Sequence, residues 1–495
     1  MQPNSNTISA MLIGREKEQK RLLQAVSEED SMFVALYGRR RVGKTYLVRE
    51  TFNNTFTFYH TGLAKSPMKK QLAAWRLSLR EYGLKKAPLP HTWLDAFEAL
   101  KEIIRQSNEP KKIIFIDELP WMDTQRSGFI PALEHFWNGW ASARKDVVLI
   151  VCGSATSWII KKILKNKGGL HNRVNIKIHL QPFTLYECER YAAHRKLGMN
   201  RRQLMEAYMI MGGIPFYWSK LERNLSLAQN IDNLFFNPDG ELHDEFDELY
   251  ASLFKNPEPY ITVVHTMGTK RIGMTRDELI DEAGLQDNGR LTEILKDLEA
   301  CGFIRRYTNF ALKTKNAVFQ LIDSYTLFYY RFIQFNTGAD ESFWSRQSGS
   351  NIYYNWCGLA FERVCLLHVT QIRKAHSIFG TISRVCSWYL PAPPKKQDDQ
   401  ATPSNAPKPK GAQIDLLIDR EDGVIDLCEM KYTKQPYEVT YDDEQKVQNR
   451  RDRLKAETGT DKSIHLILVS ASGVKPNGYS DEFQDIITAD ALFKE

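Results

Sequence analysis

The loop Gly38-Arg39-Arg40-Arg41-Val42-Gly43-Lys44-Thr45 follows an apolar run at 33–37 and precedes a segment with helical periodicity. It matches the pattern G-x-x-x-x-G-K-[ST] in the place that the pattern requires, between a strand and a helix. In such a loop the backbone N–H groups and the helix N-terminus hold phosphate oxygens. Lys44 is expected to reach the β- and γ-phosphates of ATP, and the Thr45 hydroxyl to bind Mg²⁺. Every residue of the loop is therefore a candidate for nucleotide binding.

Two further strands are expected to end beside this loop. The run 111–118 is apolar up to Asp117 and Glu118, and the run 147–153 is followed by Ser154. Asp117 is expected to hold the Mg²⁺ through water, and Glu118 to polarise the water that attacks ATP. Ser154 is placed to sense the γ-phosphate, although a serine after a strand also commonly caps a helix. Glu118 and Ser154 thus join the lysine of the loop as catalytic candidates.

Composition sets wide limits on the class of protein. The chain has 495 residues, 42% hydrophobic and 26% charged, which predicts about three or four globular domains and excludes a disordered or fibrous chain. A net charge of +7 permits an anionic partner without requiring one. Seven dispersed cysteines are typical of reduced thiols, not of a disulfide framework or a zinc site. Neither a signal peptide nor a membrane span is recognisable, so we expect a cytoplasmic protein without a membrane partner.

The three strands and the groups that end them resemble the AAA+ and STAND ATPases, specifically the archaeal-type ATPase family. This resemblance implies that Gly14 and Arg15, in Ile13-Gly14-Arg15-Glu16, line an adenine pocket. It also implies that Pro215, in Gly212-Gly213-Ile214-Pro215, helps to pack a helical subdomain over the nucleotide, although Gly212-Gly213 also reads as a plain helix stop. Arg173 stands where the family usually has Tyr-Gly-Arg and would be an arginine finger; a solvated surface arginine is the alternative.

The predicted secondary structure changes along the chain. Apolar runs at 33–37, 56–60, 113–117 and 147–153 alternate with helical segments, which indicates a parallel α/β sheet. After this the pattern becomes helical, and then three helices and a hairpin are expected within 256–323, as in a winged helix. The third of these helices is net acidic, since it carries two basic residues, Arg290 and Lys296, and three acidic ones, Glu293, Asp297 and Glu299. Because contact with nucleic-acid phosphates needs positive charge, we favour an interdomain or regulatory role over base recognition.

Two other basic regions are candidates for nucleic-acid contact. The hairpin of the winged helix carries Arg305, Arg306, Lys313 and Lys315. The segment 144–177 holds eight Lys or Arg against the single acid Asp146. It is either a track for a phosphate backbone or a solvated helix face.

Acidic residues and a lysine recur in the last part of the chain. Asp415 opens one expected strand, and Glu429 and Lys431 close the next, where alternation puts both side chains on one face. Two carboxylates on adjacent strands can bind a divalent metal, and the lysine could orient or deprotonate water. Glu362, on the preceding helix, could complete the metal shell. This arrangement fits metal-assisted phosphodiester hydrolysis, with an ordinary strand pair without metal as the alternative.

These residues resemble the PD-(D/E)XK nuclease fold, which the archaeal-type ATPase family often carries after its winged helix. The fold class we expect is therefore a multidomain α/β protein. Its units are an ATPase core at 1–181 with the P-loop parallel sheet, a helical lid at 182–255, the winged helix at 256–323, an aromatic-rich connector at 324–345, and a nuclease-like α/β domain at 346–495 with a disordered insert at 391–410.

The predicted function is an ATP-binding and ATP-hydrolysing switch of AAA+ or STAND type that is coupled to the nuclease-like domain. ATP and Mg²⁺ are the expected cofactors, with a second Mg²⁺ or a Mn²⁺ at the C-terminal carboxylates. Two alternatives stay open: an ATP-gated, metal-dependent DNA or RNA endonuclease, and an ATP-binding module without enzymatic activity that holds DNA or docks a partner. DNA, RNA, a partner protein or a second copy of the chain are the partners that these functions would require.

Overall fold

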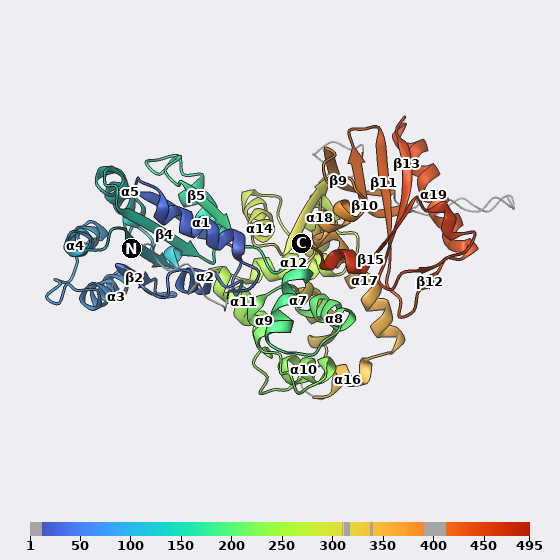
Figure 1. Ribbon diagram of the computed structural model, residues 1–495, viewed down its shortest axis with the longest axis horizontal. Helices are drawn as coiled ribbons and strands as arrows, with labels where there is room; N and C mark the ends of the chain where they lie inside the picture. Colours follow the sequence, from blue (N-terminus) through green and yellow to red (C-terminus); the bar gives the residue numbers. More distant parts are fainter. Residues whose placement is uncertain (1–11, 309, 311–316, 337–339, 391–411) are drawn as a thin grey trace.

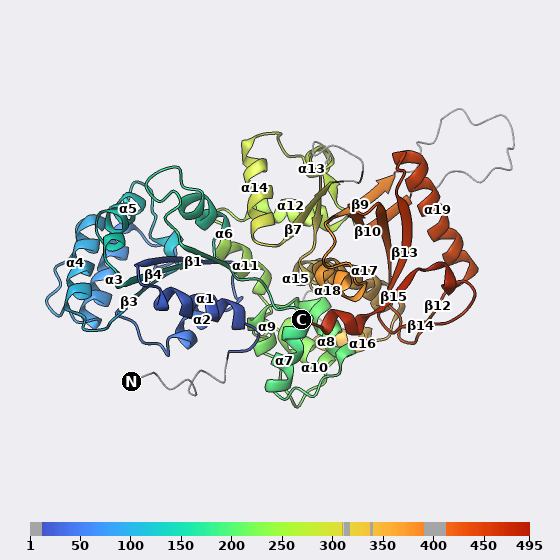
Figure 2. The ribbon, with the colours of Figure 1, turned by 45° about the horizontal axis from the view of Figure 1, so that its top comes forward.

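The structure is a computed structural model that describes residues 12–308, 310, 317–336, 340–390 and 412–495. The core that precedes residue 182 lies at one end of an elongated molecule and the C-terminal sheet domain at the other (Figure 1). The helical lid and the unit at 256–323 lie between them, as the turned view also shows (Figure 2). The predicted insert at 391–410, and the two lysines at 313 and 315, fall outside the described residues.

The core is built on a five-stranded parallel sheet with the order β2-β3-β4-β1-β5. Its strands are β1 (Met32–Tyr37), β2 (Phe58–Thr61), β3 (Lys112–Asp117), β4 (Val147–Gly153) and β5 (Ile176–His179). The parallel α/β prediction is therefore confirmed. The edge strand β5 was missed because it is short and every second residue is exposed, so it lacks a continuous apolar run.

Alternate side chains of each central strand enter two separate hydrophobic clusters. Val34 and Leu36 of β1 belong to one cluster, and Phe33 and Ala35 to the other. Both faces of the sheet are thus covered, as a parallel sheet requires. The covering elements are α1 (Glu16–Ser27), α2 (Lys44–Thr51), α3 (Met68–Glu81), α4 (Trp93–Gln106), α5 (Phe129–Gly139), α6 (Thr156–Ile159), the short helices η1 (Leu119–Trp121) and η2 (Ala141–Ala143), and the π-helical turn η3 (Ile160–Leu164).

Residues 182–255, which the structure describes in full and which we continue to call the lid, contain helices and no strand; that they close over a nucleotide stays a prediction. The lid contains α7 (Leu185–His194), α8 (Arg201–Met211), α9 (Pro215–Ser219), α10 (Leu227–Ile231), η4 (Asp232–Phe236) and α11 (Glu245–Leu253). Gly213 follows α8, and here only glycine fits, because a Cβ atom would lie 1.8 Å from the carbonyl oxygen of Phe183. The Phe183 N–H in turn donates to the Gly213 carbonyl at 2.6 Å. This close approach fixes where α9 begins relative to the end of the core sheet.

The elements expected at 256–323 are present in the expected order; the name winged helix stays a prediction. We call this segment the hairpin unit. It contains α12 (Glu258–Gly268), β6 (Met274–Thr275), α13 (Arg276–Ala283), α14 (Gly289–Ala300), β7 (Ile304–Thr308) and β8 (Ala317–Leu321), with an antiparallel sheet in the order β6-β8-β7.

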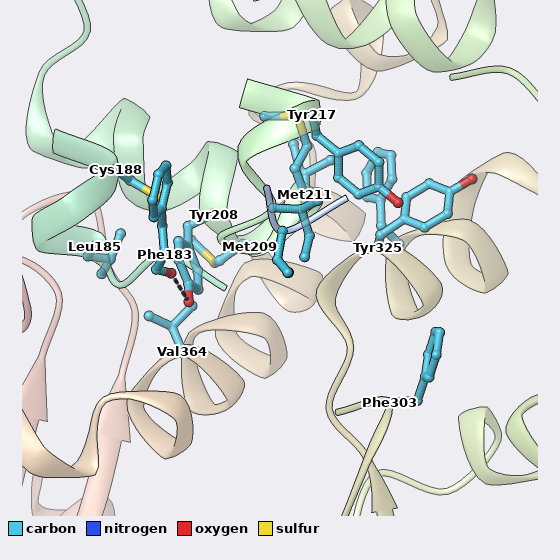
Figure 3. Packing of buried hydrophobic residues seen from close by; sticks show 14 of the residues in the cluster. Phe183, Leu185, Cys188, Tyr208, Met209, Met211, Tyr217, Phe303, Tyr325 and Val364 are labelled. Atoms are coloured by element: carbon cyan, nitrogen blue, oxygen red, sulfur yellow. Dashed lines mark hydrogen bonds between the residues drawn. The ribbon is translucent and has the colours of Figure 1, made fainter. Parts of the chain in front are cut away.

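The aromatic connector is buried where lid, hairpin unit and C-terminal domain meet. It forms α15 (Ser324–Phe328), η6 (Tyr329–Ile333) and α16 (Phe343–Gln347). Tyr325 lies beside Tyr217 of α9, with ring centroids 5.6 Å apart, and the Tyr208 hydroxyl of α8 donates to the Phe183 carbonyl at 2.9 Å (Figure 3). The aromatic stretch is thus packed against a neighbouring domain.

The C-terminal domain has a mixed sheet with the order β15-β13-β11-β10-β9, in which β9, β10 and β11 are antiparallel and β11, β13 and β15 parallel. Buried residues of α17 pack on one face, and those of α19 on the other. The elements are α17 (Asn351–Leu367), α18 (Val369–Ala375), β9 (Ser383–Leu390), β10 (Ala412–Arg420), β11 (Val424–Lys431), β12 (Tyr437–Glu438), α19 (Tyr441–Thr458), β13 (Ser463–Ser470), β14 (Val474–Lys475), η7 (Ser480–Glu482), β15 (Asp485–Thr488) and η8 (Ala489–Phe493).

Two further features of the fold concern the cysteines and the character of the helices. All seven cysteines are buried and free. Among the residues described, no helix combines the length and the apolar character that crossing a membrane requires.

Candidate functional site

The predicted phosphate loop joins β1 to α2 and is shaped by residues in left-handed conformations. Arg41 has φ 69° and Gly43 has φ 89°. The turn brings Lys44 back over the loop, where its amino group donates to the carbonyl oxygens of Gly38 and Arg39, both at 2.9 Å. Lys44 is buried, so its charge is held at the N-terminus of α2, where a phosphate group is stabilised.

The strand order places the other predicted groups at the same edge of the sheet. The Thr45 hydroxyl donates to Oδ2 of Asp117 at 2.6 Å, and Asp117 is 3% exposed. Hydroxyl and carboxylate oxygens are the ligand type that Mg²⁺ prefers. Since these two oxygens are already adjacent beside the loop, the pair fits a magnesium ion that also contacts phosphate.

Glu118 follows directly, with φ 46°. Its Oε2 accepts hydrogen bonds from the Ser154 hydroxyl at 3.0 Å and from the Ser154 N–H at 3.4 Å. Burial raises the pKa of the Glu118 carboxyl, with Lys44 opposing and Asp117 adding to the shift. A carboxylate with a raised pKa that is held by a neighbouring residue suits a general base.

Ser154 itself is not a helix cap. The residue before α6 is Ala155, and no side chain caps this helix. Ser154 instead donates to Glu118 and lines the same cavity, while its role in the site and a contact to the γ-phosphate stay predictions.

A cavity of about 500 Å³ lies between the loop, the strand ends and the lid. Arg15 and Pro215, which the family resemblance named, both line it; Gly14 does not. The Arg15 guanidinium donates to the carbonyl oxygens of Gln181 at 2.8 Å and Val42 at 3.2 Å, and it lies 4.6 Å from the centre of the Phe183 ring.

Several apolar side chains of the cavity escaped sequence reasoning. They come from the chain before α1, from the segment after β5 and from the lid, and are Leu12, Phe183, Tyr191 and Phe216. No motif marks them, since each is an ordinary aromatic or aliphatic residue of a helix or connection. Together they form the flat, apolar type of wall that a nucleotide base contacts.

The three arginines of the loop hold other parts of the molecule. Arg39 is buried, forms an ion pair with Asp323 at the end of the hairpin unit, and lies 4.8 Å from the centre of the Phe303 ring. Arg41 pairs with Glu245 of α11, and with Glu248 at 3.1 Å. Arg40 donates to the Glu248 carbonyl at 3.1 Å. These three positions were predicted only to bind nucleotide.

The residues of the phosphate loop differ in whether they line the cavity. Arg40 and Arg41 line it, whereas Gly38 and Arg39 do not. Although burial alone would lower the pKa of the Arg39 guanidinium, the charge of Asp323 and its hydrogen bond raise that pKa. Arg39 is therefore a fixed positive charge that is neutralised by another domain.

Arg173 lies in the turn between η3 and β5. Its side chain is exposed and is not part of the cavity wall. An arginine-finger role for Arg173 stays a prediction. The basic segment that contains it is likewise on the surface, since Lys161, Lys162, Lys165 and Lys167 are exposed.

The C-terminal carboxylates occupy neighbouring strands, as predicted. The register pairs Leu416 of β10 with Cys428 of β11, which puts Asp415 and Glu429 side by side at the end of the pairing. Lys431 Nζ lies 3.1 Å from Oε1 of Glu429, so these two side chains share a face. Glu429 also pairs with Arg450 of α19.

A residue of the hairpin unit enters this carboxylate site. Arg271 forms a two-nitrogen ion pair with Glu362 of α17, and its Nη2 lies 3.3 Å from Oδ2 of Asp415. Burial, together with the charge of Asp415, raises the pKa of Glu362 to about 7, and Arg271 opposes that rise. No sequence signal pointed to Arg271, because it lies 91 positions from Glu362 in the chain.

This arrangement does not fit a metal ion held by all three predicted ligands. Within the described residues, no group of three or more His, Cys, Asp or Glu side chains lies close enough to hold one. The physical reason is the pairing above: a guanidinium lies between Glu362 and Asp415, and a second one neutralises Glu429. In this conformation positive side chains occupy the surroundings of the carboxylates.

The parallel sheet, the loop after β1 and the acidic pair after β3 define the class: residues of the core form an ATP-binding P-loop ATPase domain. Residues 12–221 match the family described as an ATPase domain predominantly from Archaea. An uncharacterized protein of Methanocaldococcus jannaschii is 24% identical over 384 residues, which cover 77% of this chain and 82% of that protein.

Two solved structures are also similar to parts of this chain. One is a Walker-type ATPase of Pyrococcus abyssi, with a TM-score of 0.45 and 16% identity, covering 65% of this chain and 96% of that one. The other is the ORC2 protein of Aeropyrum pernix, with a TM-score of 0.41 and 14% identity, covering 70% of this chain and 98% of that one.

Proposed function

We propose that the protein hydrolyses ATP and uses the nucleotide state to set the contacts between its domains. The observation that carries this proposal is the partly buried Glu118 carboxylate, held by Ser154 beside Lys44 and the Thr45–Asp117 pair. These groups bring a base, a phosphate-binding charge and a magnesium-binding pair to one edge of the sheet. They are the parts that phosphoryl transfer to water requires.

Each side chain has a defined task in this reaction. The loop N–H groups and Lys44 hold the phosphates in line with the attacking water. Glu118 orients that water and accepts its proton, while Ser154 fixes the direction of the carboxylate. Thr45 and Asp117 would hold Mg²⁺, which neutralises charge on the phosphate oxygens. The apolar cavity wall keeps bulk water away from the base.

The switch role rests on the three loop arginines. Because Arg39 pairs with Asp323, and Arg40 and Arg41 with α11, the loop that would hold phosphate also holds the end of the hairpin unit and the lid. A phosphate that draws Arg40 or Arg41 toward itself would weaken their contacts with α11. The nucleotide state is thereby linked to the domain interface.

The first test is ATP binding and turnover by the whole chain. Lys44→Ala is expected to lose ATP binding by at least about tenfold, because a charge-assisted contact to phosphate is removed. Lys111→Ala is the control, since Lys111 is a lysine of the same core whose hydrogen bonds, within the part of the chain that the structure describes, go only to backbone carbonyls. Unchanged ATP affinity and turnover in Lys44→Ala would exclude the proposed site.

The hairpin unit is proposed to be a winged helix with an interdomain task. Its third helix, α14, packs against α6 of the core, and Lys161 of η3 lies 3.3 Å from Glu293 of α14. The helix that would read DNA is thus both acidic and engaged by the ATPase core. This placement supports a regulatory role in preference to base recognition.

A second candidate function is a metal-dependent nuclease that is closed in this conformation. The observation that favours it is the adjacency of Asp415, Glu429 and Lys431 on β10 and β11, with Glu362 linked to Asp415 through Arg271. Removing Arg271 leaves Glu362 and Asp415 without their shared cation. A divalent cation would then be the natural replacement.

Arg271→Gln tests this candidate by metal binding and by cleavage. We expect Mn²⁺ affinity to rise at least about tenfold, with new cleavage of DNA or RNA, and Asp415→Asn to reverse both changes. Lys296→Gln, which removes an exposed cation of the same unit, is the control. If Arg271→Gln gains neither Mn²⁺ affinity nor cleavage, the module that only holds DNA or docks a partner becomes the better candidate.

A further inference from the structure

A second cavity of about 450 Å³ lies where lid, hairpin unit, connector and C-terminal domain meet. Its walls come from Met209 of α8, from the end of α12 and the turn at 268–271, from 324–331 and from 355–363 of α17. It shares no lining residue with the nucleotide cavity of the core. Its volume lies within the range of small-molecule sites, and domain junctions are where such sites commonly occur.

The charged side chains that line this junction cavity are all basic. Lys270, Arg271, Arg331 and Arg363 line it, and no Asp or Glu of the described ranges does. Two of these cations are neutralised from outside the cavity, Lys270 by Glu278 and Glu282 and Arg271 by Glu362 and Asp415. The other two, Arg331 and Arg363, form no ion pair with any residue that the structure describes.

Of these two arginines, Arg363 gives the stronger evidence for a bound anion. It is 5% exposed, and only its Nη2 donates, to the Arg271 carbonyl at 2.5 Å. Its Nε and Nη1 are buried without a hydrogen-bond partner in the described part of the chain. A buried guanidinium with unused donors is costly, and an anion is the partner that offsets this cost.

The remaining wall suits a flat ring and a few polar groups. Trp356, Tyr330 and Met267 supply aromatic and thioether surface. The Ser324 hydroxyl and the Asn355 carboxamide also line the cavity, and neither forms a hydrogen bond with another residue in the described ranges. The cavity therefore combines guanidinium groups that can bind phosphate, aromatic surface, and hydrogen-bonding groups that have no partner in the described ranges.

From this arrangement we infer that the junction cavity binds a nucleoside monophosphate or a phosphorylated heteroaromatic compound of that size. The guanidinium groups of Arg331 and Arg363 hold the phosphate, and Trp356 and Tyr330 contact the ring. The binding site is independent of the proposed ATPase and nuclease activities. The ligand would join every unit of the molecule except the ATPase core.

Arg271 connects this ligand to the C-terminal carboxylates. The same residue lines the cavity and bridges Glu362 and Asp415. A phosphate beside Arg271 competes with these carboxylates for its guanidinium. Binding of the ligand therefore weakens the bridge and exposes the carboxylate pair, a consequence that rests on the second candidate function.

The test uses the full-length Lys44→Ala variant, so that the P-loop site does not contribute, and titrates it calorimetrically with AMP and with GMP. We expect one equivalent of at least one of them to bind, and Arg331→Ala to weaken that binding at least about tenfold. Arg331 is exposed, so this change should leave the fold intact. Arg306→Ala, an exposed arginine of the hairpin unit outside the cavity, should bind as the parent does.

Two results would overturn the inference: no binding of either nucleotide up to millimolar concentration, or binding that Arg331→Ala leaves unchanged. The link to Arg271 has its own measurement, the Mn²⁺ affinity of the same variant with and without bound nucleotide. We expect that affinity to rise at least about tenfold when the cavity is filled. An equal Mn²⁺ affinity in both states would overturn the link, independently of whether ATP is hydrolysed.

Discussion

The Glu118 carboxylate has to lose its proton before it can accept one from water. Its pKa is raised above the ordinary 4.5 by burial, so the ATPase rate should increase with pH across a range higher than a surface glutamate would give. We expect Glu118→Gln to reduce kcat at least about a hundredfold and to retain ATP binding, since general base catalysis contributes about that much. The measurement is kcat against pH, with ATP affinity determined separately.

Glu109→Gln is the matched control, because Glu109 is exposed on the connection before β3. It should leave both kcat and the pH profile unchanged. Glu118→Gln should not lower the free energy of unfolding either, because burial disfavours the charged form of this side chain. A kcat that is flat down to pH 4.5 in the wild type would contradict the assignment of Glu118 as the base.

The single residues also show where sequence reasoning reached its limit. Lys44, Thr45, Asp117 and Glu118 could be placed because each stands at a fixed distance from a strand end, and parallel strands bring such ends together. Arg271 could not be placed in this way. Its partners lie 91 and 144 positions away, and nothing local in the chain encodes a contact of that separation.

Among the elements, the connector that carries α15 and η6 has the clearest energetic role. Phe328 is fully buried, and its ring centroid lies 4.9 Å from that of Trp344 and 5.5 Å from that of Trp356. Phe328→Ala is expected to lower the free energy of unfolding by about 3–5 kcal/mol, through lost burial and the cavity left behind. Phe335→Ala, which removes a ring that is 77% exposed on the same segment, should change it by less than about 0.5 kcal/mol.

Thermal or denaturant unfolding of both variants measures this difference. Because the protein has several domains, the transition that contains the connector has to be resolved from the others. Equal losses in the two variants would contradict the role of the connector as the shared core of lid and C-terminal domain.

The elements were easier to predict than their placement. Strands β1, β3 and β4 are continuous apolar runs, and the helices of 182–255 follow the 3.6-residue period, so both could be predicted from the sequence. The edge strand β5 and the two-residue strand β6 could not, because one alternates with exposed residues and the other is too short to carry a pattern. The packing of the units against one another could not be predicted, because periodicity describes one element at a time.

Across the whole molecule, the buried Arg39–Asp323 ion pair links the nucleotide loop to the end of the hairpin unit, where Asp323 caps α15. Breaking such a pair on one side leaves an uncompensated buried charge, at a cost of about 3–5 kcal/mol. We therefore expect Arg39→Met and Asp323→Asn each to lower the free energy of unfolding by about 3 kcal/mol. The double variant should lose at least about 1 kcal/mol less than the sum of the two. Strict additivity would show that the pair is not energetically coupled.

The same double variant tests whether ATP acts beyond the core. In the wild type, ATP held by the loop is expected to change hydrogen exchange at α15 and in the hairpin unit, because Arg39 and Asp323 join these segments to the residues that contact phosphate. In Arg39→Met/Asp323→Asn, ATP should still protect the loop and α2, while the exchange of α15 and the hairpin unit should no longer depend on it. Hydrogen exchange with and without ATP, compared between the two proteins, measures both effects in one experiment. If the distant response survives in the double variant, the signal travels through Arg41 and α11 instead, and Arg41→Ala should then abolish it.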